Sequence, residues 1–354
     1  MSTGFQKYLK FLGLSACIAS LSCLSSCNSI FENLEECQKR VALRFVFEYN
    51  MEFANSFPSQ SHCLTLLVYN ADGSWENTFV ETGEVLADEN YRMTLDLEPG
   101  SYHCIAYGGL ECEEKAFTHM LDPQSTDYRD LLVKLDRTLV ESDIPVKRRL
   151  HDFFYGSVDF TIEKRSSQYV EYKVEMMKNT NAIRVMLQHI DGSPVDVDDF
   201  TFEIADDNTA FGHDNDVIAD GGVTYTPWSK GQQTVGEDAN GNFGVTVAYA
   251  ELSTSRLMKR NNIALTIKKT QQAMARDNAS ADDIVAQLPL QDYLPLLKSD
   301  YFDTMNDQEF LDRQSVFPLY FFLDKNDKWV YVTISVGDWT VRINNESYNP
   351  DGNR

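Results

Sequence analysis

The feature that most constrains this chain is a two-residue alternation of apolar side chains that recurs along its length. The first example lies between Arg40 and Tyr49, where the alternating apolar residues are Val41, Leu43, Phe45, Phe47 and Tyr49. Because successive side chains of a β-strand point to opposite faces of a sheet, this period predicts a strand with one buried face.

The same alternation predicts further strands, and two of them end at sequences that favour tight turns, Asp72-Gly73 and Glu98-Pro99-Gly100. In the first half, the predicted strands are Arg40–Tyr49, Cys63–Tyr69, Tyr91–Leu97, Ser101–Tyr107 and Val158–Ile162. In the second half, they are Tyr169–Met177, Ala182–Gln188, Phe200–Ile204, Phe243–Tyr249, Ile263–Lys268, Trp329–Val336 and Trp339–Ile343. Short strands separated by turns are typical of β-sandwiches.

Three stretches depart from this pattern. Residues 110–150 are mixed and charged, and we expect a long crossing connection with a short helix there. Ser280–Lys298 and Asp307–Arg313 have helical character. The chain of 354 residues is long enough for two cores, and the charged stretch Lys164–Gln168 is a suitable boundary between them. The sequence therefore predicts a mainly all-β protein with two tandem β-sandwich domains, 27–167 and 168–354, and short helices in the connections.

The N-terminal residues have the layout of a secretory signal. Lys7 and Lys10 precede an apolar stretch, residues 11–24, which is too short and too rich in serine to span a membrane as a helix. Leu24-Ser25-Ser26-Cys27 follows and resembles the bacterial lipobox, in which the cysteine receives a diacylglycerol and an N-acyl chain. We therefore predict a signal peptide over residues 1–26 and lipid attachment at Cys27, which several acyl chains would make stable.

Two alternatives to Cys27 stand beside this prediction. Leu14-Ser15-Ala16-Cys17 matches the same pattern, but cleavage there would leave an apolar region of only about six residues, shorter than secretory signals use. The other alternative is an ordinary signal peptide whose cysteines are incidental. Export implies an oxidising compartment, so Cys37, Cys63, Cys104 and Cys112 are candidates for up to two disulfides whose pairing the sequence leaves open.

Composition argues against nucleic acid as a partner and offers little for catalysis. The net charge of −23 would repel phosphate backbones. The sequence has no GxSxG, HExxH, P-loop or GxGxxG motif, and its six histidines lack metal-ligand spacing. Acidic stretches at 196–199 and 206–216 could attract calcium, but they do not follow the EF-hand pattern and are better explained as solvated loops. We therefore expect no catalytic residue, no metal site and no cofactor other than the covalent lipid.

The four tryptophans raise the possibility of a sugar-binding platform. They are Trp75, Trp228, Trp329 and Trp339. Trp329 and Trp339 lie in or beside apolar strands, which favours packing in the core for these two. Glycan binding at the cell surface is therefore an alternative function, and a surface hydrolase with paired carboxylates is a weaker one.

Several segments, taken in order, resemble one family. They are Arg44–Met51, Tyr91–Met93, Leu97–Tyr102, Ile105–Leu110, Phe154–Gly156, Lys178–Val185, Asp307–Arg313, Phe322–Asp324 and Ile334–Trp339. Together they are similar to the FimB-like fimbrium anchoring subunits of Bacteroidales, which are surface lipoproteins. The resemblance covers nearly the whole mature chain, although residues 110–150 and 206–242 carry little of it.

The resemblance implies two transthyretin-like β-sandwich domains, attachment of the lipid to the outer membrane, and exposure at the cell surface. It also implies a fimbrial stalk subunit as the partner and a role in anchoring the fimbrium and limiting its length. Another accessory or tip subunit would have similar sequence features.

The mechanism that the resemblance implies is β-strand complementation, in which one subunit fills an apolar groove of the next with a strand. An anchor would keep its own first strand, here Val41, Leu43, Phe45, Phe47 and Tyr49, and so accept no further subunit. The candidate donor is the C-terminal strand, in which Trp339, Val341 and Ile343 alternate with polar residues. The alternative is that this strand completes the second sandwich.

Overall fold

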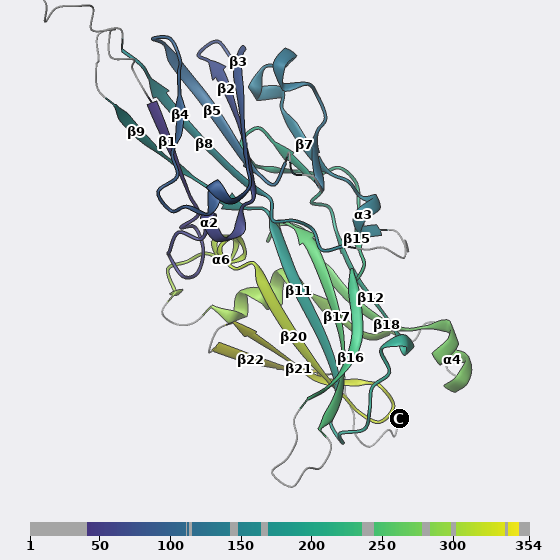
Figure 1. Cartoon of the computed structure of the whole chain (residues 1–354). Coiled ribbons are helices and arrows are strands. Elements are labelled where there is room, and N and C mark those ends of the chain that lie inside the picture. Colours follow the sequence, from purple (N-terminus) through teal and green to yellow (C-terminus); the bar gives the residue numbers. More distant parts are fainter. Residues whose placement is uncertain are drawn as a thin grey trace, which may run out of the picture.

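The computed structural model describes residues 41–110, 112, 115–141, 148–163, 169–235, 244–277, 284–298, 302–336 and 339–346. The predicted signal peptide, Cys27, Cys37 and the predicted boundary segment 164–168 lie outside the described residues. Figure 1 shows an elongated molecule, with the strands of the first half at one end and most of those of the second half at the other.

Two sheets enclose the first core. A five-stranded sheet has the order β10–β8–β5–β2–β3, and a three-stranded sheet has the order β4–β1–β9. The strands of the larger sheet are β2 (Cys63–Asn70), β3 (Trp75–Thr82), β5 (Ser101–Gly108), β8 (Phe154–Thr161) and β10 (Met177–Lys178). Those of the smaller sheet are β1 (Val41–Val46), β4 (Met93–Leu95) and β9 (Val170–Glu175). Leu43, Leu66 and Cys104 belong to one buried apolar cluster between them.

The opposite face of the five-stranded sheet is also covered. A four-stranded sheet, β14–β13–β7–β6, joins strands from both halves of the sequence. Its strands are β6 (Phe117–His119), β7 (Leu132–Leu135), β13 (Ala210–Gly212) and β14 (Val217–Ile218). Phe117 and Phe211 share a buried cluster with Tyr107 of β5. Since β2 and β5 are covered on both sides, their sequences are almost continuously apolar.

The remaining strands form two facing sheets. A six-stranded sheet has the order β16–β17–β11–β20–β21–β22, and a four-stranded sheet has the order β15–β12–β18–β19. The six strands are β11 (Thr180–His189), β16 (Ser229–Val235), β17 (Val245–Ser255), β20 (Val316–Leu323), β21 (Trp329–Val336) and β22 (Trp339–Asn344). The four strands are β12 (Phe200–Asp206), β15 (Val223–Tyr225), β18 (Ala264–Lys269) and β19 (Ile284–Pro289). Leu187, Phe202 and Phe321 lie in the core between the sheets.

Helices are short and lie in the connections, as predicted. The α-helices are α2 (Phe57–Gln60), α3 (Thr138–Glu141), α4 (Gln271–Asp277), α5 (Leu290–Tyr293) and α6 (Asp307–Arg313). The 3-10 helices are η1 (Glu84–Ala87), η2 (Pro123–Ser125), η3 (Tyr128–Asp130), η4 (Val197–Asp199) and η5 (Leu294–Leu297). Across the described ranges, no helix has the length and hydropathy needed to cross a membrane.

The fold class is mainly β with sandwich-like packing, in agreement with the prediction. The sheet pairing crosses the predicted boundary at 167/168, however. β9 pairs with β1, and β10 pairs with β8, so residues 170–178 belong to the sheets of the first half. β13 and β14 also return from the second half to pair beside β7.

Two local predictions were wrong, and several strands, β20 among them, were not predicted. Residues 110–150 include the strands β6 and β7 in addition to a short helix. The segment Ser280–Lys298, expected to be helical, contains the strand β19 before the short helices α5 and η5. β20 was not predicted, although it lies inside the six-stranded sheet, parallel to β11. The helix Asp307–Arg313 is confirmed.

Candidate strand-exchange site

The first strand is an internal strand of its sheet. All six residues of β1 pair with β9 in parallel, and Val41 to Leu43 pair with β4 on the other side. Val41, Leu43, Phe45 and Phe47 are each at most 5% exposed and lie in the apolar cluster between the two sheets. Of the five apolar residues predicted for this strand, four are thus buried in one core.

The chain that leaves β1 is fixed by a compact turn. The Asn50 side-chain amide donates to the carbonyl oxygens of Phe47, at 2.7 Å, and Ala54, at 2.8 Å. The Phe47 backbone N–H donates to Oδ1 of Asn55 at 3.0 Å. These bonds satisfy polar groups beside a buried strand, which stabilises the position of its C-terminal end.

Tyr49, the fifth predicted residue, contacts the second half of the chain. It is half-buried, and the Arg313 guanidinium of α6 lies 4.0 Å from its ring centroid. The same guanidinium lies 4.9 Å from the Phe53 ring, and Glu309 accepts a 2.8 Å hydrogen bond from it. This cation–π contact connects the segment after β1 to α6. No spacing in the sequence indicated Arg313, because the contact joins residues that are far apart in the chain.

The candidate donor strand lies at a sheet edge. β22 pairs with β21 through residues 339–344, and no strand among the described residues pairs with its other side. Val341 and Ile343 are half-buried and pack against the large core, whereas Thr340, Arg342 and Asn344 are exposed. In this conformation β22 completes the six-stranded sheet. The side chain of Trp339 lies outside the described part of the chain.

The three cysteines in the described ranges form a disulfide and a buried thiol. Cys63, at the start of β2, is bonded to Cys112, with a Cα–Cα distance of 5.7 Å. Cys104 is free and fully buried in β5, and burial raises the pKa of its thiol well above the ordinary value. A thiol of this kind behaves as a small apolar side chain.

One Ser–His–Asp grouping has a structural explanation. His189 lies 2.7 Å from Oδ1 of Asp327 through Nε2 and 2.9 Å from Oγ of Ser193 through Nδ1. The Ser193 hydroxyl donates to Asp191 at 2.6 Å. The hydrogen bond to Asp327 is the main cause of a raised His189 pKa, which favours imidazolium. The Ser193 hydroxyl and backbone N–H both donate to Asp191, so these contacts hold the turn between Asp191 and Ser193 beside His189.

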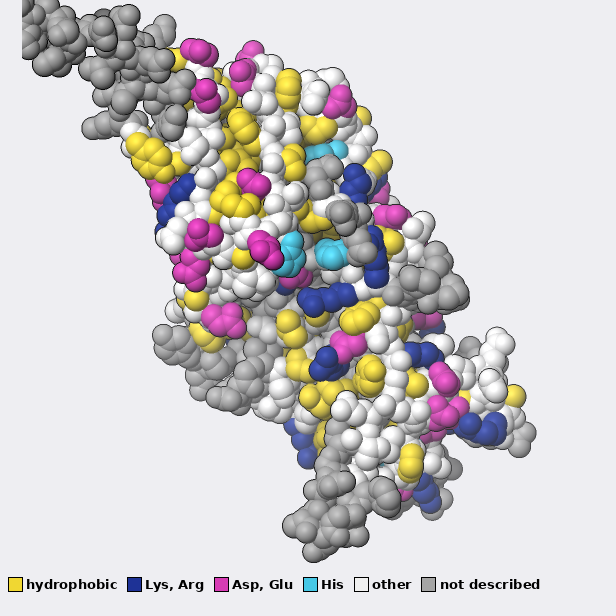
Figure 2. Space-filling model, viewed as in Figure 1, with side chains coloured by type: hydrophobic (Ala, Val, Ile, Leu, Met, Phe, Trp, Pro, Cys, Tyr) yellow, Lys and Arg dark blue, Asp and Glu magenta, His cyan; other side chains and the backbone are white. Residues whose placement is uncertain are grey.

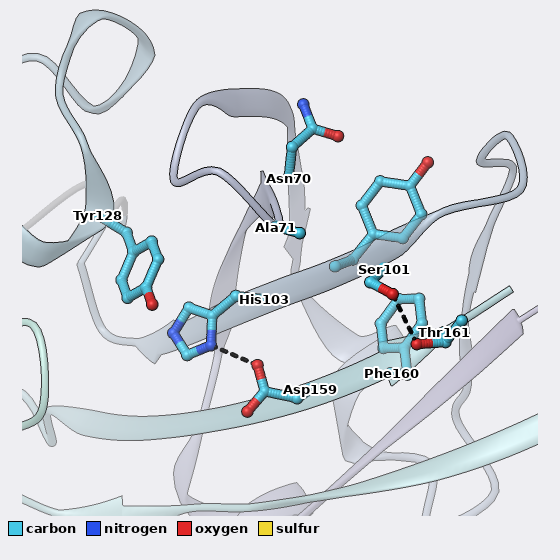
Figure 3. Close-up of a pocket in the computed structure, with 9 residues that line it drawn as sticks. Asn70, Ala71, Ser101, His103, Tyr128, Asp159, Phe160 and Thr161 are labelled. Atoms are coloured by element: carbon cyan, nitrogen blue, oxygen red, sulfur yellow. Dashed lines mark hydrogen bonds and ion pairs between the residues drawn. The ribbon is translucent and has the colours of Figure 1, made fainter.

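A shallow cavity of about 340 Å³ opens at the end of the five-stranded sheet. His103 of β5 lies opposite Asp159 of β8, 2.7 Å apart through Nδ1 and Oδ1, and Tyr128 stacks on His103 with centroids 4.2 Å apart (Figure 3). The hydroxyls of Ser101 and Thr161 are 2.8 Å apart in the same cavity. These side chains pair across two strands, and a hydrogen bond of this kind contributes about 1 kcal/mol.

The acidic stretches form caps and ion pairs. Asp196 caps η4, and Asp199 binds Arg276 at 2.7 Å. In the second stretch, Asp206 accepts a 2.7 Å hydrogen bond from Asn261. In the described ranges, no group of three His, Cys, Asp or Glu side chains is arranged to hold a metal ion.

The tryptophans occupy different environments. Trp75 and Trp329 pack against the large core. Trp228 lines a second cavity, of about 380 Å³, on the outer side of the six-stranded sheet.

Comparison with known proteins gives a consistent result. Residues 34–345 match the family described as fimbrillin-A associated anchor proteins Mfa1 and Mfa2. A structure described as a candidate adhesin from Bacteroides thetaiotaomicron is 44% identical, with a TM-score of 0.76 over 86% of this chain and 98% of the other. No curated protein sequence matches.

Two more distant structures share the fold. A candidate adhesin from Bacteroides ovatus is 24% identical, with a TM-score of 0.67, over 87% of this chain and 96% of the other. The fimbrial anchor protein Mfa2 from Porphyromonas gingivalis is 14% identical, with a TM-score of 0.58, over 84% of this chain and 97% of the other.

Proposed function

Since this chain belongs to the family of fimbrillin-A associated anchor proteins, we propose that it holds a fimbrium to the outer membrane through a lipid on Cys27 and ends the growth of that fimbrium. Family membership establishes the general role: the protein is a non-enzymatic fimbrial accessory protein, associated with the cell surface, that interacts with other fimbrial subunits. The lipid and the strand mechanism are the proposed part.

The observation that carries the termination role is the position of β1. A subunit that lacked its first strand would have an apolar groove open to the next subunit. Here β1 would fill that space: β9 pairs with its whole length, β4 pairs with Val41 to Leu43, and all its side chains except Arg44 are buried. The Asn50 turn and the Arg313 contact hold the chain that follows it. The retained strand leaves no place for an incoming one.

Attachment through Cys27 is supported by the sequence Leu24-Ser25-Ser26-Cys27. The acidic chain has no electrostatic attraction to anionic lipids, so a covalent anchor would supply the affinity.

The Cys27→Ala variant tests this attachment. We expect it to incorporate no labelled palmitate and to leave the membrane fraction, whereas wild-type protein and a Cys17→Ala control remain labelled and membrane-bound. Retention of label and membrane association in Cys27→Ala would refute attachment at this residue.

We further propose that β22 is the strand donated to the stalk subunit. It lies at an edge and pairs on one side only, and its apolar residues Val341 and Ile343 are half-buried, so less surface is uncovered when it leaves than for an internal strand. Once transferred, alternate side chains would fill the partner's groove while main-chain hydrogen bonds supply affinity.

A disulfide between β21 and β22 can distinguish two roles of β22, donation to the stalk subunit and completion of its own sheet. Ser335 and Thr340 lie opposite each other on β21 and β22, with hydroxyl oxygens 2.8 Å apart. The oxidised Ser335→Cys/Thr340→Cys variant should keep β22 in its own sheet and release fimbriae into the medium. The matched control is Tyr320→Cys/Thr333→Cys, which locks β20 to β21 and leaves β22 free. Fimbriae that stay attached in the Ser335/Thr340 variant would exclude donation by β22.

A further inference from the structure

The outer face of the six-stranded sheet carries aromatic side chains at regular positions. Tyr249 of β17 and Tyr320 of β20 both lie opposite Met186 of the intervening strand β11. Their neighbours Leu187 and Phe321 point into the core, so these three side chains point outward. Tyr320 is 38% exposed, and Tyr249 and Met186 are partly exposed.

The two tyrosines lie on strands that are not adjacent. Since one strand lies between them, their backbones are two spacings apart, about 10 Å. The Tyr249 ring lies across β16, on the side away from β20, so the two rings are separate contacts for a ligand that extends across the sheet.

A cavity of about 380 Å³ lies at one end of this row. Gly231 of β16 lies opposite Tyr249, and a Cβ at this position would come within 2.8 Å of the phenol oxygen. The glycine therefore allows the tyrosine ring to lie across β16. Trp228, which immediately precedes β16, adds a second aromatic side chain to the cavity. Within the described residues, no hydrogen bond is made by the Trp228 indole or the Tyr249 hydroxyl.

Charged and amide side chains accompany these rings. Arg184 and Glu251 line the cavity and form an ion pair of 2.6 Å through Nε of the arginine. The Arg184 side chain is 56% exposed, and its two Nη groups have no hydrogen-bond partner among the described residues. A planar guanidinium beside a carboxylate can bind adjacent hydroxyls of one sugar as donor and acceptor.

The distribution of apolar surface favours a carbohydrate over a protein partner. Figure 2 shows hydrophobic side chains interrupted by basic and acidic ones over the sheet of β11, β17 and β20. Protein interfaces usually have a contiguous, desolvated core from which charged residues are depleted. Separate rings with polar groups between them match a sugar chain, in which apolar C–H faces alternate with hydroxyls.

We propose that the outer face of the six-stranded sheet binds a neutral polysaccharide, with Tyr249 and Tyr320 as stacking rings and Trp228, Arg184 and Glu251 as the lining of an end subsite. This activity is separate from anchoring and does not depend on β1, β22 or the lipid.

Affinity electrophoresis of the full mature chain in gels containing hydroxyethylcellulose, xylan or galactomannan tests the proposal. We expect at least one polymer to retard the wild type, and Tyr249→Ala or Tyr320→Ala to weaken binding by about tenfold each. Tyr169→Ala is the matched control, because Tyr169 is 58% exposed and lies outside this sheet. Circular dichroism confirms that each variant is folded.

Two results would overturn the proposal. One is a wild-type protein that none of the three polymers retards. The other is retardation that survives both Tyr249→Ala and Tyr320→Ala, or that Tyr169→Ala reduces equally, since the binding surface would then lie elsewhere.

Discussion

His119 is a buried group that makes the stability of the fold depend on pH. It lies on β6, edge-on to the Tyr107 ring at 5.3 Å, and both ring nitrogens are buried without a hydrogen-bond partner in the described chain. Burial, together with the smaller effect of the Lys115 charge, lowers the His119 pKa to about 4. The histidine is therefore neutral in the native protein at neutral pH.

This pKa gives stability a defined pH dependence. Between about pH 6.5 and 4 the unfolded chain binds a proton at His119 and the native chain does not, so the free energy of unfolding falls as pH falls through this window. We expect the free energy of unfolding, measured with urea, to fall between pH 7 and pH 4.5 by about 1–3 kcal/mol less in His119→Phe than in the wild type. The exposed His62 supplies a control, His62→Gln. Identical pH slopes for His119→Phe and the wild type would contradict this account.

Some features of individual residues could be predicted from the sequence, and others could not. Val41, Leu43, Phe45 and Phe47 are buried as their alternation predicts, because burial of a strand face is recorded in the local pattern. The contact between Arg313 and Tyr49 and the choice of Cys112 as the partner of Cys63 depend on which strands become neighbours. No local pattern contains that information.

At the scale of elements, the Cys63–Cys112 disulfide ties β2 to the segment that follows β5. It closes a loop between residues 49 apart in the sequence and limits the conformations of the unfolded chain. We expect Cys63→Ser/Cys112→Ser to lower the free energy of unfolding by about 2–4 kcal/mol, as measured with urea. Reduced wild-type protein should behave like the variant. An unchanged midpoint in both would show that the disulfide contributes nothing to stability.

Physical reasons explain why several strands were not predicted from the sequence. β20 contains Pro318 and apolar residues on both faces, which hides its two-residue period. The short strand β7 pairs with β13, which lies far along the chain, and β6 pairs with β7 in turn. β19 is only six residues long and is followed directly by helices. Long-range pairing determines these elements more than local preference does.

At the scale of the whole molecule, β1 and β22 differ in their positions within their sheets. β1 lies inside its sheet with buried side chains, whereas β22 lies at an edge and is held on one side. The proposed mechanism requires this asymmetry, because in it the anchor donates a strand and accepts none. The alternation in the sequence predicted both strands, but only the sheet order distinguishes an internal strand from an edge strand.

The most direct test of anchoring and termination is electron microscopy of fimbriae in a strain that lacks this protein, with fimbrial length and the fraction in the culture medium measured together. We predict longer fimbriae released into the medium, with attachment and normal length restored by wild-type protein and attachment not restored by Cys27→Ala. Fimbriae of unchanged length that remain on the cells of the deletion strain would contradict the account.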